Sequence, residues 1–542
     1  MVLSINGRTL PAGRGLGQGS ARSPVRKAWE RRLCRVLAVA ALGVLPACGP
    51  RQAPYEAKLL TEVCAGTPAL NGVRYLRFRV TGPGMEPVVR FSLVERGLEE
   101  LPAVPVGKGW VLEVRGYTDL PKQGGRVVAL GRSHPFEVPE SAEAPRPTVR
   151  VAVRRVGTYV RPGSAKDACT SLAEPRAGHT ATVLEDGRVL LAGGFQLDLN
   201  EDGSTLSSAE LFNPVTGTLE QALTLGTGEG GDFRASPRAF HTATRLPGGK
   251  VLLAGGEVRS VEGTVPVRSA LVLDVARRTS TLVELKAARS HHAAAADSGG
   301  RVLLVGGVGP GGTVVSEAEG FDPETDRVFS VGTPVPRVGM GVMPVRDGRR
   351  IAVVGGSDGR ELRPEVLFFS YEGGTFAPAG EGPRLREPRR DAALVPFGGS
   401  EQLLFVGGHD SAEGVESAPR LLASSEVISS GEATRVTAGP QVFARSEPCA
   451  VALPDGRVLT LGGLRSTANG LVSAPQGELL VPGKEGGTPV MFGLPMLERQ
   501  RHQHTCTVLE DGSVLIAGGL DDDGRQRTTL GDLVIYTPAP LD

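Results

Sequence analysis

Residues 175–194 read PRAGHTATVLEDGRVLLAGG, and variants of this stretch recur six more times along the chain. Each copy has two short apolar runs, separated in several copies by an Asp–Gly pair, and ends in two adjacent glycines. Short apolar runs joined by a tight turn predict an antiparallel hairpin. The glycine pairs are spaced 49 to 62 residues apart and begin at Gly193, Gly255, Gly306, Gly355, Gly407, Gly462 and Gly518.

The segment after each glycine pair completes the repeat. A variable loop leads to a third apolar run, and a turn such as 213–217 (NPVTG) or 322–326 (DPETD) leads to a short fourth run. Four antiparallel strands per repeat, seven times, predict an all-β chain with a seven-bladed β-propeller over residues 175–542. The glycine pair permits a close backbone approach where a Cβ would crowd the neighbouring blade.

This repeat resembles the kelch family. The matching pieces are 175–179, the run that ends at Gly194, and 209–214 (AELFNP). The repeat departs from the family in the fourth strand, where Leu219 or Phe329 stands in place of a tryptophan. The whole arrangement resembles exported kelch-repeat lipoproteins of myxobacteria, and propellers of the same family include galactose-oxidase-like copper enzymes. That resemblance implies tyrosines and histidines at one metal, with a cysteine for the cofactor.

The last repeat ends after its third apolar run, 533–536, so it lacks a fourth strand. An open sheet edge would otherwise remain in the ring. We therefore expect residues 156–174 to serve as a linker and to supply the closing strand, around 168–172.

The preceding part of the chain predicts a separate small domain. Residues 58–155 contain short runs with period-two alternation, such as 74–80, 111–117 and 148–153, broken by turn residues. That pattern predicts a β-sandwich.

The N-terminal region reads as an export signal. Residues 26–35 are strongly basic and 36–47 are apolar or small, a length that fits a signal peptide better than a membrane span. The run ends in Leu45-Pro46-Ala47-Cys48, which resembles a bacterial lipobox. We expect a leader over 1–47, lipidation of Cys48, a tether over 48–57 and a place in the cell envelope, at the outer membrane or cell surface. An ordinary cleavage site nearby is the alternative.

Four other cysteines follow Cys48 in the chain, and an oxidising compartment would favour their pairing. Cys64 and Cys169 bracket the first folded region and form the expected pair.

Two polar positions recur in the repeats. An arginine precedes each first strand, and an acid stands at the start of six of the third strands. In an antiparallel blade both positions lie at the same end, so we expect Arg–carboxylate pairs within the blades. An anion-binding crown of arginines is the alternative. The arginines are Arg176, Arg238, Arg289, Arg337, Arg389, Arg445 and Arg501. The acids are Glu210, Glu319, Glu365, Glu426, Glu478 and Asp532.

Four repeats place a histidine three residues after the arginine: His179, His241, His292 and His504. Because first strands line the channel of a propeller, these histidines could bind a metal. Structural hydrogen bonding is the interpretation we prefer, since four non-equivalent blades do not present a tetrahedral site.

One loop has the pattern of a calcium site. Asp198, Asn200 and Asp202, followed by a glycine, match the opening of a D-x-N-x-D-G loop, but the bidentate acid at its twelfth position is missing. We therefore expect a solvated acidic loop and no cofactor, with calcium bound at this loop as the alternative.

The formal net charge of +1 argues against a nucleic-acid partner. No catalytic constellation emerges at a loop tip. We therefore expect a non-enzymatic, lipid-anchored binding or scaffolding protein that recognises a protein or glycan of the cell envelope or exterior. The long loops after the glycine pairs would form its binding face, with Arg238 and residues 198–202 as first contacts. A secreted propeller enzyme, either a galactose-oxidase-like oxidase, a lyase or a hydrolase, is the alternative.

Overall fold

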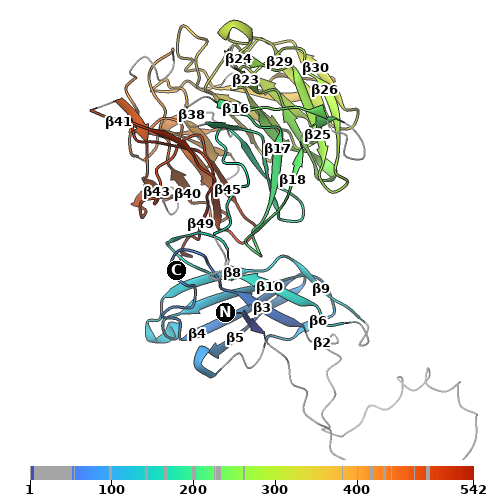
Figure 1. Cartoon of the computed structure of the whole chain (residues 1–542), viewed down its shortest axis with the longest axis vertical. Coiled ribbons are helices and arrows are strands. Elements are labelled where there is room, and N and C mark those ends of the chain that lie inside the picture. Colours follow the sequence, from blue (N-terminus) through green and yellow to red (C-terminus); the bar gives the residue numbers. More distant parts are fainter. Residues whose placement is uncertain are drawn as a thin grey trace, which may run out of the picture.

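The computed structural model shows two β-structured bodies, a small one and a larger ring-like one (Figure 1). No α-helix occurs in the part of the chain that the structure describes; its helical turns are the 3-10 segments Val94–Arg96, Pro121–Gln123, Pro247–Gly249 and Pro310–Gly312. The structure describes residues 2–4, 52–53, 55–96, 101–140, 145–163, 169–197, 203–224, 226–227, 234–260, 263–380, 382–398, 401–413, 419–430, 435–440, 442–468, 470–483 and 489–541.

The small body contains two main sheets, of which the larger is antiparallel. Alternation sets its core: in β4, every second side chain from Leu76 to Val80 is buried against Trp110 and Val114 of β7. The strands are β1 (Val2–Ser4), β2 (Gln52–Ala53), β3 (Glu56–Leu60), β4 (Tyr75–Gly82), β5 (Met85–Leu93), β6 (Val104–Pro105), β7 (Gly107–Tyr117), β8 (Val127–Arg132), β9 (Phe136–Val138), β10 (Thr148–Ala152) and β11 (Arg154–Arg155). One sheet has the order β1-β3-β10 and the other β11-β8-β7-β4-β5, with β9 on β7 and a separate β2-β6 pair.

The large body consists of seven four-stranded antiparallel sheets among the described residues. The first three are β13 (Thr180–Val183), β14 (Val189–Ala192), β17 (Ser208–Asn213) and β18 (Thr218–Thr224); β21 (Thr242–Arg245), β22 (Lys250–Ala254), β25 (Ser269–Asp274) and β26 (Thr279–Glu284); and β27 (Ala293–Ala296), β28 (Val302–Val305), β29 (Ala318–Asp322) and β30 (Arg327–Val331). The next three are β31 (Gly341–Val345), β32 (Arg350–Val354), β33 (Leu367–Glu372) and β34 (Thr375–Pro378); β35 (Ala393–Pro396), β36 (Gln402–Val406), β37 (Ser425–Ser429) and β38 (Arg435–Ala438); and β39 (Cys449–Ala452), β40 (Val458–Leu461), β43 (Gly477–Val481) and β44 (Val490–Gly493). The seventh is β45 (Thr505–Val508), β46 (Val514–Ala517), β49 (Leu533–Tyr536) and β12 (Tyr159–Val160).

The sheets form a closed ring. The first strand of each sheet contacts the first strand of the next, and β45 of the seventh contacts β13 of the first. Seven apolar clusters fill the seven junctions, one between each pair of neighbouring sheets. The second strands are buried on both faces because they lie between two such clusters, which explains their continuous apolar runs.

The strand that closes the ring differs from the expected one. Tyr159 and Val160 of β12 pair with Tyr536 and Ile535 of β49, whereas Ser171 makes only an isolated bridge to Asp532. The closing strand therefore lies at 159–160 and not around 168–172. Its two residues bring the aromatic ring of Tyr159 to 5.3 Å from that of Tyr536, a contact that no residue of 168–172 could make.

The glycine pairs are required by close packing, against the next sheet at the first glycine and within their own repeat at the second. Gly193 and Gly194 have φ of 61° and 97°. A Cβ on Gly193 would lie 2.4 Å from the carbonyl oxygen of Arg238 in the next sheet, and one on Gly194 would lie 2.7 Å from that of Ala177. Only glycine fits both the left-handed backbone and this close approach.

The small body docks on one end of the ring. Arg154 Nη1 donates to Asp511 Oδ2 at 2.5 Å, and Nη2 donates to the carbonyl oxygen of Pro214. His134 contacts Glu510 in the same turn as Asp511. These partners lie in the short turns that join first to second and third to fourth strands.

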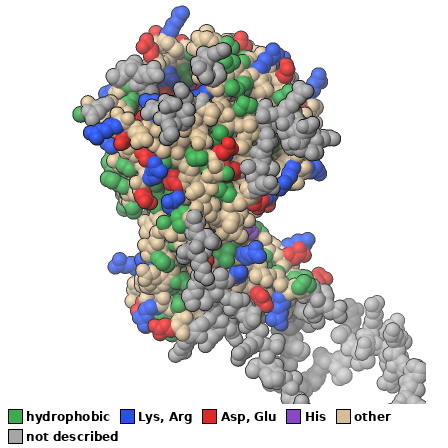
Figure 2. Space-filling view, in the orientation of Figure 1, with side chains coloured by type: hydrophobic (Ala, Val, Ile, Leu, Met, Phe, Trp, Pro, Cys, Tyr) green, Lys and Arg blue, Asp and Glu red, His purple; other side chains and the backbone are tan. Residues whose placement is uncertain are grey.

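The surface seen in Figure 2 shows basic and acidic side chains interspersed over both bodies. Among the described residues, no helix has the length and apolar character needed to cross a membrane. Of the expected leader the structure describes only residues 2–4, and Cys48 lies outside the described residues.

Candidate active site at the mouth of the ring

The repeated arginines support the glycine turns. Each guanidinium is buried, and each donates through Nη1 to the carbonyl oxygen of the first glycine of its own repeat, at 2.8 to 3.1 Å. Six arginines also approach the acid of their repeat. The distances are 2.7 Å for Arg176–Glu210, 2.5 Å for Arg289–Glu319, 3.8 Å for Arg337–Glu365, 3.3 Å for Arg389–Glu426, 2.9 Å for Arg445–Glu478 and 2.8 Å for Arg501–Asp532. Guanidinium groups engaged in this way are not presented to an anion in solvent.

Arg238 is the member without an acid, and the expectation that it contacts a partner is wrong. Its side chain is fully buried, and it donates to Ser236 Oγ at 2.7 Å and to Ser269 Oγ at 3.0 Å. Two hydroxyls therefore take the place of the carboxylate. Burial without a counter-charge lowers the pKa of Arg238 to about 10.

A ring of seven residues, which we call the mouth collar, lies where the chain enters each first strand. Each collar residue stands two positions after a repeated arginine, and each has a positive φ between 50° and 68°. Five of them are not glycine, a strained state that costs about 1–3 kcal/mol per residue and that clusters at functional sites. The collar residues are Gly178, Phe240, His291, Gly339, Asp391, Glu447 and Gln503.

Backbone hydrogen bonds tie the collar together across the sheets. Five collar amides donate to the carbonyl oxygen of the collar residue in the preceding sheet, at 2.8 to 3.1 Å. These amides belong to Gly178, Phe240, His291, Asp391 and Glu447. The side chains at this mouth are therefore held on a rigid frame, which is what a preorganised site requires.

Two cavities open at the collar. One of about 500 Å³ is lined by collar residues and by the four repeated histidines beneath them. The other, of about 630 Å³, has a mixed lining that includes Phe195, Leu520, Arg259 and the Asp522–Arg527 ion pair. Glu447 and Gln503 line both cavities, so the two spaces share one boundary.

The second cavity lies against a raised wall. The loops after four glycine pairs form hairpins, and neighbouring hairpins contact one another across the sheets. The hairpins are β15 (Phe195–Leu197) with β16 (Gly203–Thr205), β23 (Glu257–Ser260) with β24 (Gly263–Pro266), β41 (Leu464–Thr467) with β42 (Gly470–Ser473), and β47 (Leu520–Asp522) with β48 (Arg527–Thr529). The mouth is therefore walled on one side. Asp198, Asn200 and Asp202 lie outside the described residues.

Asp391 has partners that keep it ionised. Its Oδ2 accepts hydrogen bonds from Arg390 Nε and from His409 Nε2, both at 2.9 Å. His409 is fully buried, and its Nδ1 accepts from the amide of Ser411, so the ring proton is on Nε2. Burial favours a higher pKa for Asp391, but the hydrogen bond from His409 and the charge of Arg390 outweigh it and lower that pKa.

Glu447 lies next to Asp391 in the collar, in the opposite environment. Burial and then the negative charge of Asp391 raise the pKa of Glu447 to about 7, against smaller opposing effects of His291 and Gln503. One carboxylate in the mouth is thus held ionised, while its neighbour is held close to the protonated form.

Aromatic and cationic groups stack beside these acids. The His291 ring stacks on Phe240 with 4.1 Å between centroids, and Phe240 lies 5.6 Å from Phe195. The guanidinium of Arg259 lies 4.0 Å above the Phe195 ring.

Three of the repeated histidines pair with threonines across sheet junctions. His179 Nε2 lies 3.1 Å from Thr505 Oγ1, His241 Nε2 lies 3.0 Å from Thr180 Oγ1, and His292 Nε2 lies 2.9 Å from Thr242 Oγ1. The structure therefore gives each of these three rings a different neighbour instead of bringing them to one metal.

The cysteines form two disulfides among the described residues. Cys64 and Cys169 are joined over a sequence separation of 105, and Cys449 of β39 is joined to Cys506 of β45. The ligand atoms of Cys449, His504 and Cys506 lie within 4.8 Å of one another. A disulfide sulfur is not the thiolate that binds a metal, so this group holds no ion in its oxidised form.

Comparison with known proteins supports the fold. A fungal alcohol oxidase of the AA5 family, in complex with copper, matches with a TM-score of 0.51 and 17% identity over 71% of this chain and 76% of that one. The protein YjhT matches with a TM-score of 0.43 and 12% identity over 59% of this chain and 99% of its own. No family model and no curated protein matches the chain. A galactose-oxidase-like, kelch-type β-propeller is thus among the structural neighbours.

Two expectations are corrected by this neighbour. The expectation of a non-enzymatic protein, which rests on the lack of a catalytic constellation in the sequence, is contradicted, because a copper alcohol oxidase has a similar fold. The expectation of no cofactor beyond calcium is also corrected, because that neighbour binds copper and the described residues include the Cys449–His504–Cys506 group.

The mouth itself does not fit the tyrosine-containing copper centre implied by the kelch resemblance. No tyrosine is among the described residues that line its two cavities. Tyr371 packs against Phe376 of its own, fourth sheet and against Phe329 of the third sheet, and Tyr536 packs against Tyr159. We therefore derive no step through copper at this site.

Proposed function

We propose that the protein is an enzyme on a seven-bladed kelch-type β-propeller and that the mouth collar forms its active site. The reaction is a general acid–base reaction, hydrolysis or elimination, on a small polar molecule. The observation that carries this proposal is the pair of carboxylates, Asp391 and Glu447, that face one cavity of about 500 Å³ from differently charged surroundings. Titratable pairs whose environments differ in this way are typical of acid and base partners.

The roles follow from the contacts. Asp391 is the base, because Arg390 and His409 stabilise its anion and orient one of its oxygens. Glu447 is the acid that protonates the leaving atom, because it lies on the wall between the two cavities and beside that anion. General acid–base groups of this kind contribute about 10²–10⁴ in rate.

The second cavity indicates the substrate. Phe195 and Leu520 offer an apolar surface, and Arg259 places a cation over the Phe195 ring. The same lining holds Glu447 and the Asp522–Arg527 ion pair, so a compact molecule with one apolar face and one hydrogen-bonding polar face complements it.

Turnover assays test the proposal. The purified chain is assayed with 4-nitrophenyl esters, glycosides and glycuronides for hydrolysis, and with short uronate oligosaccharides for the absorbance of a new double bond. We expect turnover of at least one class and a loss of at least about 100-fold in Asp391→Asn/Glu447→Gln. A turnover rate of the double variant equal to that of the wild type would contradict the proposal, and so would no turnover by folded wild-type protein.

The wall of hairpins supports a second role at the same face. We propose that it also binds a protein or glycan, because long hairpins on a rigid ring are suited to recognition. Replacement of 521–528 with a Gly/Ser turn should abolish capture of such a partner, whereas Asp326→Asn in a turn of the opposite end should not. Capture that survives the 521–528 replacement and is lost in Asp326→Asn would show that the partner binds the opposite end of the ring.

We also propose export and lipid anchoring through Cys48, with the two disulfides as support for an oxidising compartment. Cys48→Ala should leave the leader uncleaved and remove the acyl chains. An unchanged mature mass and membrane fraction would contradict the anchor.

A further inference from the structure

Four sheet junctions carry a repeated histidine, and one of the four lacks the histidine–threonine pair. At three junctions, the histidine three residues after the arginine pairs with a threonine of the preceding sheet. Those threonines stand one position after the corresponding histidine of their own repeat. In the sixth sheet this position is Cys449, so His504 of the seventh sheet meets a sulfur where the other three histidines meet a hydroxyl.

His504 has no hydrogen-bond partner among the described residues. Both its Nδ1 and its Nε2 are unpaired, whereas His179, His241 and His292 leave only Nδ1 unpaired. The side chain is only 8% exposed. A buried imidazole without a partner is costly, and such a group in a native structure calls for an explanation such as an absent ion.

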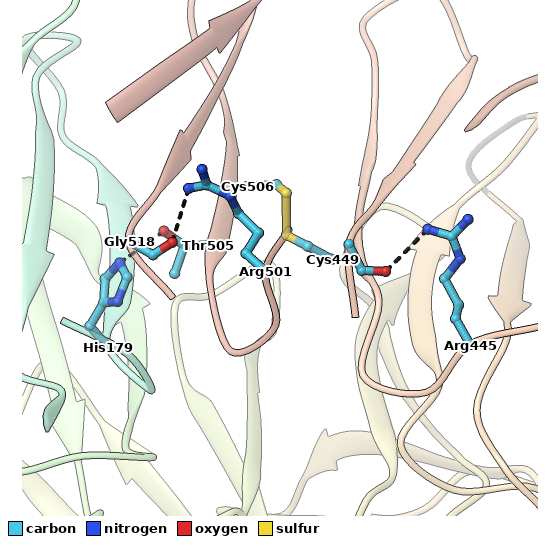
Figure 3. Close-up of a disulfide and its surroundings, with 8 residues drawn as sticks. His179, Arg445, Cys449, Arg501, Thr505, Cys506 and Gly518 are labelled. Atoms are coloured by element: carbon cyan, nitrogen blue, oxygen red, sulfur yellow. Dashed lines mark hydrogen bonds between the residues drawn. A yellow bond between two sulfur atoms is a disulfide. The ribbon is translucent and has the colours of Figure 1, made fainter. Parts of the chain in front are cut away.

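The sulfurs lie at the same point. Cys506 lies in β45 two residues after His504, which directly precedes that strand, and Cys449 begins β39 on the neighbouring sheet. Figure 3 shows the Cys449–Cys506 bond crossing between these two first strands, with the His179–Thr505 pair on the far side of β45. His504 also lines the 500 Å³ cavity.

We propose that the reduced protein binds a thiophilic d¹⁰ metal ion, with Zn²⁺ as the reference, through Cys449, Cys506 and His504. Two thiolates and one imidazole are the ligand types that zinc prefers, and a set of three leaves one position open. That position adjoins the cavity beneath the collar. The site is independent of the acid–base pair, and it turns the disulfide into a redox control of metal binding.

The chemistry balances with a dithiol as reductant. The dithiol gives two electrons and two protons to the Cys449–Cys506 bond, which becomes two thiols, and leaves as its own disulfide. Zn²⁺ then displaces the two thiol protons, which pass to solvent, while the neutral imidazole contributes its lone pair.

Cobalt spectroscopy on the full chain tests the proposal. The chain is reduced with dithiothreitol, desalted without oxygen and titrated with Co²⁺, whose thiolate absorption reports coordination by sulfur. We expect about one Co²⁺ per reduced chain, displaced by Zn²⁺, and none in the oxidised chain. Zn²⁺ should also raise the melting temperature of the reduced chain and leave that of the oxidised chain unchanged.

Matched variants locate the ions. Cys449→Ser and His504→Ala should each weaken binding at least tenfold. His292→Ala, which removes the equivalent histidine at a threonine junction, and Cys64→Ser/Cys169→Ser, which removes the other disulfide, should retain the site. No uptake by the reduced wild type, or uptake by Cys449→Ser and His504→Ala equal to that of the reduced wild type, would overturn the proposal. The comparison of oxidised with reduced wild type decides the question even where a variant fails to fold.

Discussion

The two ends of the ring are built from the same repeat, but the residues outside the strands have different roles at each end. At the docked end, short turns supply Asp511 and Pro214 as partners for Arg154 of the small body. At the open end, five non-glycine residues hold a strained backbone around a cavity. The difference shows that the docked end uses its polar groups to hold two bodies together, while the open end keeps polar groups available at a cost in stability.

The largest expected effect is a loss of folding stability at low pH, which arises from the buried histidines at the open end. Burial, followed by the charge of Arg176, lowers the pKa of His179 to about 3, and burial lowers the pKa of His241 and of His292 well below the usual value. In the unfolded chain these rings bind protons below about pH 6.5. The unfolded state therefore binds more protons than the native state, and stability is lost as the pH falls from 6.5 towards 3.

Each such histidine contributes at most about 1.4 kcal/mol per pH unit in this window. Urea unfolding at pH 7, 5.5 and 4.5 should show a decrease of several kcal/mol, less steep in His179→Gln. If the free energy of unfolding stayed flat down to pH 4.5, these rings would not be buried in the neutral form.

A smaller loss is expected at the docked end. Arg154→Met leaves Asp511 and the carbonyl oxygen of Pro214 without their partner, which should cost about 3 kcal/mol. The matched control is Arg188→Met, because Arg188 pairs with the more exposed Asp186 and Glu220 and should cost less than about 1 kcal/mol. Urea melts measure both. Neither change should alter turnover; a loss of turnover in Arg154→Met would mean that the two ends are coupled.

The smallest effect tests the strain in the collar. Gln503 has φ of 51°, so removal of its Cβ should relieve the backbone. We expect Gln503→Gly to be more stable than Gln503→Ala by about 1 kcal/mol, the reverse of the order at an ordinary position. Equal stabilities in thermal melts would remove the argument that the collar is strained.

Much of the fold could be predicted from the sequence because the repeats share their scaffold residues. The glycine pairs and the arginines recur at fixed positions since each performs the same packing task in every sheet. The seven four-stranded sheets and the arginine contacts follow from that regularity. The closing strand could not be located, because a strand of two residues carries no periodic pattern.

The candidate active site was missed for the opposite reason. Asp391, Glu447 and His291 occupy one position of the repeat, between the arginine and the first strand, that carries six different residue types in seven copies. A position that varies between copies carries no repeated sequence pattern. These residues come together only in the folded ring, where they line one cavity. The environment of Arg238 was also hidden, since serines that replace a carboxylate carry no distinctive pattern.

The central claim is that chemistry occurs at the collar, and one matched pair of substitutions tests it most directly. Asp391 and Asp326 both have positive φ, at 53° and 52°, but Asp326 lies in a turn between third and fourth strands at the docked end. With a substrate found by the turnover assays, kcat should fall about 10²–10⁴-fold in Asp391→Asn and stay within about twofold in Asp326→Asn, at equal melting temperatures. An unchanged kcat in folded Asp391→Asn would contradict the account.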